Sequence, residues 1–142
     1  MIYMIRQVGN TNIIEIMKEN APLRMMNQTS VEFMNQWCLY HGSTFEGRRV
    51  ACAQQMMIKQ KVPILISEQT RDILFPTKSM EHDDCIWINY QGITEIKKMK
   101  TKTMIIFRND KKVVLDIDIR CMRRQLERCE KYLTLIKSFC EN

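Results

Sequence analysis

Apolar and polar residues recur along this chain with two different periods, which together predict a mixture of strands and helices. Apolar and charged residues are mixed over residues 12–18, where we expect a short strand. Apolar residues then recur at helical spacing over residues 30–41, between a Thr29–Glu32 capping box and Gly42, so we expect a helix there. Residues 43–49 are interpreted as a loop. The period of residues 50–58 is ambiguous, and their composition slightly favours a helix.

The second half of the chain has a clearer strand pattern. Short buried strands are expected at 63–66 and at 73–75, the second ended by Pro76. Further strands are expected at 85–90, 93–97, 103–108 and 112–117, joined by short connections at Gln91-Gly92 and at 109–111. Strands joined by such short turns are typical of an antiparallel meander.

One long amphipathic helix is expected at the C-terminus, over residues 120–140. Its apolar residues are spaced by four and three positions and form one stripe, widened by Leu135 and Phe139; the stripe consists of Met122, Leu126, Cys129, Leu133, Ile136 and Cys140. We expect this stripe to pack on the sheet, with an intermolecular coiled coil as the alternative. The basic residues of the helix fall mostly on its other face.

These elements predict a single α+β domain over residues 1–142, with an antiparallel β-meander sheet, a helix in the N-terminal half and a long C-terminal amphipathic helix. Four Gly and three Pro leave little room for a linker. The start contains no signal peptide, although translation could begin at Met1 or Met4. We therefore expect a cytoplasmic protein whose six Cys are buried thiols.

Basic residues are clustered in two segments of a chain whose net charge is positive. The chain carries 22 Lys and Arg against 16 Asp and Glu, a net charge of +6. Basic residues gather in two segments, the first with Lys97, Lys98, Lys100 and Lys102 and the second with Arg120, Arg123 and Arg124. Two such clusters predict a surface that binds polyanions, and a solvated face is the alternative for each.

Candidate chemistry other than anion binding is weak. Cys38 and His41, with His82 and Cys85, form two pairs at zinc-ligand spacing, but such pairs are frequent by accident and we expect no metal and no cofactor. The motifs of deaminases, phosphate-binding loops and serine hydrolases are absent from the sequence, so catalysis is not expected.

Four blocks in the middle of the chain resemble, in order and spacing, the bacterial competence transcription factor family ComK. They are CLYHGSTFEGRR at 38–49, KVPILI at 61–66, ILFPTKS at 73–79 and CIWI at 85–88. The resemblance weakens after residue 88 and extends to about residue 128. It also implies a further C-terminal tail, so we expect this chain to be a shorter member of the family without that tail.

The resemblance implies a regulator that binds paired A/T-rich boxes of double-stranded DNA from the minor-groove side, as an oligomer. It implies activation of DNA-uptake genes, and an adaptor that delivers the protein to a Clp-type protease. An alternative is a ComK-derived interaction protein that modulates a full-length relative without activating transcription itself.

The residues add candidate contacts to this expectation. Arg48 and Arg49 follow Gly47, and adjacent Arg residues suit a narrow A/T minor groove or its phosphates. The alternative for this pair is a surface charge or an anchor for its own loop. Lys59, Lys61 and the lysines of 97–102 are expected to position phosphates, together with Arg120, Arg123 and Arg124.

Overall fold

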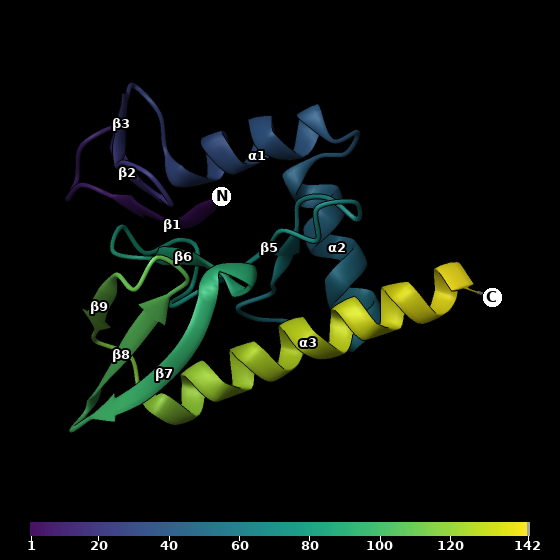
Figure 1. The fold of residues 1–142 in the computed structure, drawn as a ribbon. Helices are drawn as coiled ribbons and strands as arrows, with labels where there is room; N and C mark the ends of the chain where they lie inside the picture. Colours follow the sequence, from purple (N-terminus) through teal and green to yellow (C-terminus); the bar gives the residue numbers. More distant parts are fainter. Residues whose placement is uncertain (142) are drawn as a thin grey trace.

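The structure is a computed structural model that describes residues 1–141, with side chains described through residue 139. It confirms an α+β fold with antiparallel sheets and a long C-terminal helix, as Figure 1 shows. A six-stranded sheet has the order β3-β2-β1-β6-β5-β4, with β1 at Ile2–Gln7, β2 at Ile13–Lys18, β3 at Leu23–Met26, β4 at Ile64–Leu65, β5 at Ile73–Pro76 and β6 at Ile86–Asn89. A three-stranded sheet has the order β7-β8-β9, with β7 at Ile93–Met99, β8 at Lys102–Phe107 and β9 at Lys112–Leu115. The helices are α1 at Ser30–Tyr40, α2 at Phe45–Met56, the short η1 at Tyr90–Gly92 and α3 at Ile119–Glu141.

The six-stranded sheet separates two hydrophobic cores. Successive strand residues point to opposite faces, so Leu74 and Trp87 join one core while their neighbours Phe75 and Ile88 join the other. The first core is closed by α1 and the start of α2. The second core is closed by the three-stranded sheet and α3. The chain therefore forms three layers, with the six-stranded sheet in the middle.

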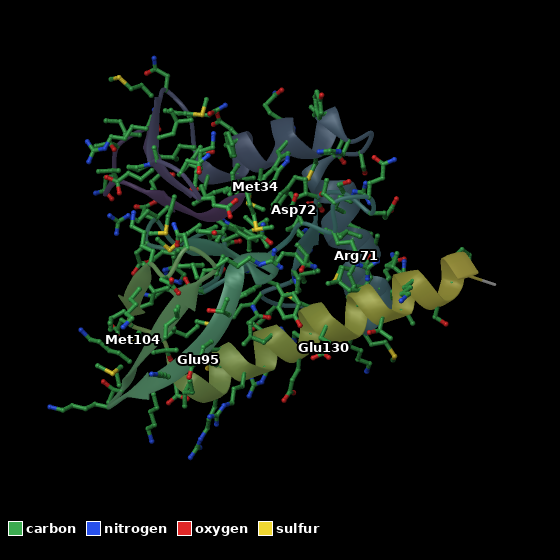
Figure 2. All side chains as sticks on the ribbon, viewed as in Figure 1. Met34, Arg71, Asp72, Glu95, Met104 and Glu130 are labelled. Atoms are coloured by element: carbon green, nitrogen blue, oxygen red, sulfur yellow. The ribbon has the colours of Figure 1, made fainter. Side chains whose placement is uncertain are left out.

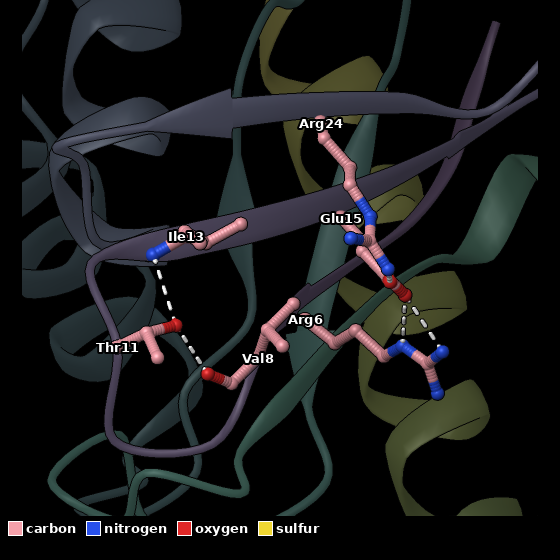
Figure 3. Close-up of polar contacts among 6 residues, drawn as sticks. All are labelled: Arg6, Val8, Thr11, Ile13, Glu15 and Arg24. Carbon is pink, nitrogen blue, oxygen red and sulfur yellow. Dashed lines mark hydrogen bonds and ion pairs between the residues drawn. The ribbon is translucent and has the colours of Figure 1, made fainter.

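The N-terminal residues form the central strand β1, which the sequence analysis did not predict. Charged residues on this strand and its neighbours are paired across the sheet: Glu15 lies opposite Arg6 on one side and Arg24 on the other. Figure 3 shows Glu15 between the two guanidinium groups, with nitrogen–oxygen distances of 2.7 Å to Arg6 and 2.6 Å to Arg24. These hydrogen bonds lower the pKa of the Glu15 carboxyl. Both arginines are thus committed to a carboxylate within the fold.

The expected helix at 30–41 is confirmed, but the expected loop at 43–49 is wrong. The Thr29 hydroxyl accepts a hydrogen bond from the Glu32 amide at 3.1 Å and begins α1. The Thr44 hydroxyl accepts one from the Gly47 amide at 2.9 Å, so α2 begins at Phe45. Gly47 therefore lies in the first turn of a helix, and Arg48 and Arg49 are helical residues.

The expected meander is confirmed for β7, β8 and β9, whereas the strand expected at 85–90 belongs to the other sheet as β6. The chain turns between the sheets at η1. There Gly92 lies against Tyr3, since a Cβ on Gly92 would stand only 2.5 Å from the ring. Tyr3 in turn stacks on Phe107 of β8, with ring centroids 5.0 Å apart. This contact joins the two sheets.

The apolar stripe of α3 packs inside the molecule along most of its length. Met122, Cys129 and Leu133 are buried in the second core, and Ile136 is half-buried against it. Leu135 and Phe139 are exposed, by 41% and 83%, so the stripe is not covered at this end; Cys140 lies outside the described side chains. Among the described residues, no helix is long and apolar enough to cross a membrane.

Replacing Asn89 with Ala is expected to lower the free energy of unfolding by about 2–4 kcal/mol, because it leaves the partners of a buried amide without their hydrogen bonds. Asn89 is fully buried, and its amide donates to the Ile2 carbonyl at 2.9 Å and to the Asp72 carboxylate at 2.8 Å. Urea unfolding measures the change. Asn109→Ala is the matched control, because Asn109 also donates to a backbone carbonyl but is exposed. Equal losses for the two variants would contradict the prediction.

Candidate nucleic-acid interface

Arg48 and Arg49 both have carboxylate partners. The side chain of Arg48 is only 14% exposed and its guanidinium lies 2.8 Å from Glu68. Arg49 is 29% exposed and binds Glu46 through two nitrogens, at 2.9 and 2.5 Å. Because each charge is already balanced, neither arginine extends free into solvent as a groove contact would.

A group of cations gathers where the loop after α2 meets α3. Arg49, Lys59 and Lys61 line one groove of about 460 Å³, in which Glu81 is the one acidic lining residue. Helix α3 holds this loop: the Gln125 amide donates to the Lys61 carbonyl at 2.9 Å, and Arg128 donates to the Gln60 carbonyl at 3.1 Å.

Two further candidate residues extend this group along α3. Arg120 and Arg124 are exposed and stand eight and four residues before Arg128, so the three lie along one side of the helix. We call Arg49, Lys59, Lys61, Arg120 and Arg124 the loop–helix cluster.

A second group lies at the hairpin between β7 and β8. Lys97, Lys98 and Lys102 are exposed on the paired strands, and Lys100 stands in the two-residue turn that joins Met99 to Lys102. Figure 1 shows this hairpin at the lower left edge of the molecule, near the first turns of α3. Thr103 of β8 holds the hairpin to the segment before α3, since its hydroxyl donates to the Ile117 carbonyl at 2.7 Å. We call Lys97, Lys98, Lys100 and Lys102 the hairpin cluster.

The structure places Arg123 apart from both clusters. It lines a groove of about 500 Å³ between β7 and α3, together with Arg108 and three glutamates, Glu95, Glu127 and Glu130. Figure 2 labels Glu95 on β7 and Glu130 on α3, the two elements that border this groove. Charges of both signs make this groove a poorer anion site than either cluster.

Ion pairing separates candidate cations that the sequence alone could not rank. Within the described part of the chain, no carboxylate lies within ion-pair distance of Lys59, Lys61, Arg120, Arg124 or the four hairpin lysines. An unbalanced cation keeps its full attraction for a phosphate, whereas a paired one must first lose its partner. The two clusters therefore have the electrostatics that an anionic ligand requires.

Two of the candidate lysines also have an unusual backbone. Lys61 has φ of 53° and Lys100 has φ of 60°, the left-handed region that a residue with a Cβ adopts at a cost of about 1 kcal/mol or more. Glycine is the usual residue in such positions. Strained residues of this kind occur often at functional sites, and neither lysine has an ion-pair partner among the described side chains.

The four zinc candidates are not brought together. Among the described residues, no three His, Cys, Asp or Glu side chains are placed to hold a metal ion. Burial raises the pKa of the Cys38 thiol to about 11, and it raises the pKa of Cys85, whose thiol donates to the Lys78 carbonyl at 3.4 Å. Protonated thiols are poor zinc ligands.

The residues from 2 to 140 match a family model described as ComK protein. The chain belongs to the ComK protein family. The competence transcription factor of Bacillus subtilis (strain 168) is 27% identical to it over 104 residues, which are 72% of this chain and 54% of that relative. The chain thus spans about half the length of the curated relative. No solved structure matches it.

Sequence reasoning missed the residues that position the loop–helix cluster. Gln125 is 3% exposed and donates to the carbonyls of both Lys61 and Pro76. A signal for it existed, because Gln125 is a polar residue within the apolar stripe of the helix. Nothing in the sequence indicated that Arg128 would donate to the Gln60 carbonyl and so help to hold the loop.

The buried thiols predict a loss of stability in alkaline solution. Burial raises the pKa of Cys52 from its ordinary value of 9.0 to about 12 and that of Cys129 well above 9.0, so these thiols stay protonated in the folded chain at pH values where they ionise in the unfolded chain. Their contribution is fully present below pH 9 and is lost as pH rises toward 12. We expect the free energy of unfolding, measured with urea at each pH, to fall over this range.

A variant isolates the thiol contribution. Cys52→Ala removes one of the shifted groups, so its stability should fall less steeply between pH 9 and 12 than that of the unmodified chain. Cys121→Ala is the control, because Cys121 is only half-buried. Identical slopes for Cys52→Ala and the unmodified chain would contradict the assignment.

Proposed function

We propose that this chain is a cytoplasmic transcription regulator of competence that binds A/T-rich double-stranded DNA from the minor-groove side. Membership of the ComK family and the name of the Bacillus subtilis relative support the regulatory role. The observation that carries the DNA-binding part is that all cations of the loop–helix and hairpin clusters except Arg49 make no ion pair within the described structure. DNA phosphates supply the matching negative charge, and they dominate the affinity of most DNA-binding proteins.

The two clusters suit different tasks. Lys59 and Lys61 of the loop–helix cluster line a groove on a loop that hydrogen bonds from α3 hold, so these lysines are presented at fixed positions, as phosphate contacts that set orientation require. The hairpin cluster protrudes and carries four lysines around one turn. Arg49 belongs to the proposed surface because it lines the same groove as Lys59 and Lys61. Arg48 has a structural role instead, through its ion pair with Glu68.

Fluorescence anisotropy with two labelled duplexes tests the proposal. One duplex carries two spaced A/T tracts and the other has the same bases in mixed order. Tighter binding to the A/T duplex that persists as salt rises is the expected result. Equal binding to both would remove the A/T preference, and no binding at low salt would remove the DNA-binding function.

The proposal includes self-association and proteolytic control, as the family resemblance implies. The exposed Leu135 and Phe139 at the end of α3 favour self-association. They equally favour the alternative function, in which the protein pairs with a longer relative without activating transcription. Capture of such a relative by a chain that binds neither duplex would support the alternative. A Clp-type adaptor remains the expected partner for degradation.

Neutralising the lysines of either cluster is expected to reduce the salt dependence of DNA binding. Each lost phosphate contact lowers the slope of log K against log salt by about 0.9, so Lys59→Gln with Lys61→Gln should lower it by about 2. Lys97→Gln with Lys98→Gln should do the same. Lys18→Gln is the control, because Lys18 is exposed and lies outside both clusters. An unchanged slope in both double variants would place the DNA elsewhere.

Replacing Lys100 with Gly is expected to raise stability and weaken DNA binding together. The change relieves the backbone strain at φ of 60°, which is worth about 1 kcal/mol, and removes one phosphate contact. Thermal unfolding and the salt slope measure the two effects. Lys100→Gln should lower the slope equally without the gain in stability, and Thr101→Gly should give no gain. A Lys100→Gly variant with unchanged affinity would contradict a role for this charge.

A further inference from the structure

We propose that the β7–β8 hairpin enters the minor groove of the A/T-rich duplex, with Met99 as a wedge between two base pairs. This inference rests on the DNA binding proposed above and adds the element that reads the duplex. It starts from an apolar side chain that the fold does not use. Met99 is the last residue of β7 and is 43% exposed, immediately beside the turn.

The two faces of the hairpin are very different. Thr103, Ile105 and Phe107 of β8 are fully buried and face α3 and the second core. The residues between them point to the opposite face. There Met99 lies opposite Lys102, and Lys97 lies opposite Met104. This outer face therefore presents lysines and methionines side by side. Figure 2 labels Met104, one of these methionines, at the edge of the molecule.

The charge around Met99 selects the partner. The chain has no acidic residue between Glu95 and Asp110, and the four lysines of the hairpin cluster make no ion pair within the described structure. An apolar protein partner would have to bury these ammonium groups without counter-charges, which is costly. A nucleic-acid groove instead offers phosphates on both rims and apolar base faces between them.

The size of the hairpin determines how it can enter. Neighbouring strands stand about 4.8 Å apart, and the minor groove of B-DNA is only about 6 Å wide, so a two-stranded ribbon with side chains does not fit an undistorted groove. Entry must open the groove and unstack a base step. Proteins that do this insert an apolar wedge, and Met is one of the residues used.

Methionine suits the wedge because its side chain is unbranched, flexible and polarisable. A/T-rich boxes suit it because TA steps unstack more easily than others. Lys97, Lys98, Lys100 and Lys102 surround Met99 and would bind phosphates on either rim of the opened groove. Met57 offers a comparison, because it is 90% exposed and lies beside the other cluster, two residues before Lys59.

The test uses the full chain and an A/T duplex with 2-aminopurine in place of adenine at a central TA step, where unstacking raises the fluorescence. At saturating protein, the unmodified chain is expected to raise the fluorescence several-fold. Met99→Ala should lose more than half of this rise. Its salt slope should stay unchanged, because no charge is removed. Met99→Leu, which keeps an apolar wedge, should retain most of the rise.

Matched controls make each outcome decisive. Met57→Ala should behave as the unmodified chain, and equal thermal unfolding of all variants confirms that the exposed positions leave the fold intact. If Met99→Ala keeps the full signal, if Met57→Ala loses it, or if the unmodified chain binds without any rise, the wedge is overturned while DNA binding stands. If no duplex is bound at low salt, the proposed function fails and the wedge fails with it.

Discussion

The buried amide of Asn89 holds together the point at which the two sheets meet. It donates to β1 and to Asp72 before β5, while its oxygen accepts from the Gln91 amide at 3.1 Å and sets the turn into η1. Gln91 continues the network to the Arg71 carbonyl, and the Arg71 guanidinium donates to the Leu133 carbonyl in α3 at 2.9 Å. Figure 2 shows Arg71 and Asp72 between the upper layers and α3. This network thus links the turn before the hairpin sheet, and α3, to the central sheet, which carries both proposed DNA-contacting clusters in one frame.

The cations of the fold divide into those that are paired with a carboxylate and those that are not. Arg6 and Arg24 share Glu15, Arg48 uses Glu68, and Arg49 uses Glu46. Within the residues that the structure describes, the lysines of the hairpin and of the loop after α2 lack such partners. A basic total charge therefore says less about binding than the distribution of the charges that remain uncompensated. The left-handed backbone at Lys61 and Lys100 adds to this distinction, because stability alone would favour glycine there.

Much of this architecture could be predicted from local pattern. Some features depend only on the residues of one short segment. These are the Thr29 cap, the strands around 109–111 and the apolar stripe of α3. The start of α2 could not be predicted as easily, because Gly47 resembles a turn residue until Thr44 is seen to cap the helix. The strand β1 was also missed, since its six residues lie at the start of the sequence and have a turn signal only on their C-terminal side. Pairing of Arg48 with Glu68 joins residues 20 apart, so no local pattern contains it.

The hydrogen bond from Arg71 to the Leu133 carbonyl divides α3 into two parts with different environments. Before it, buried side chains tie the helix to the core; beyond it, Ile136 is half-buried while Leu135 and Phe139 face solvent. A short helical extension without tertiary contacts is marginal in water. Amide hydrogen exchange along α3 should therefore follow two regimes, slow and set by global unfolding where side chains of the helix pack on the core, and fast and set by local fraying in its last turn. The outer turns can then change their order or their partner at little cost to the domain.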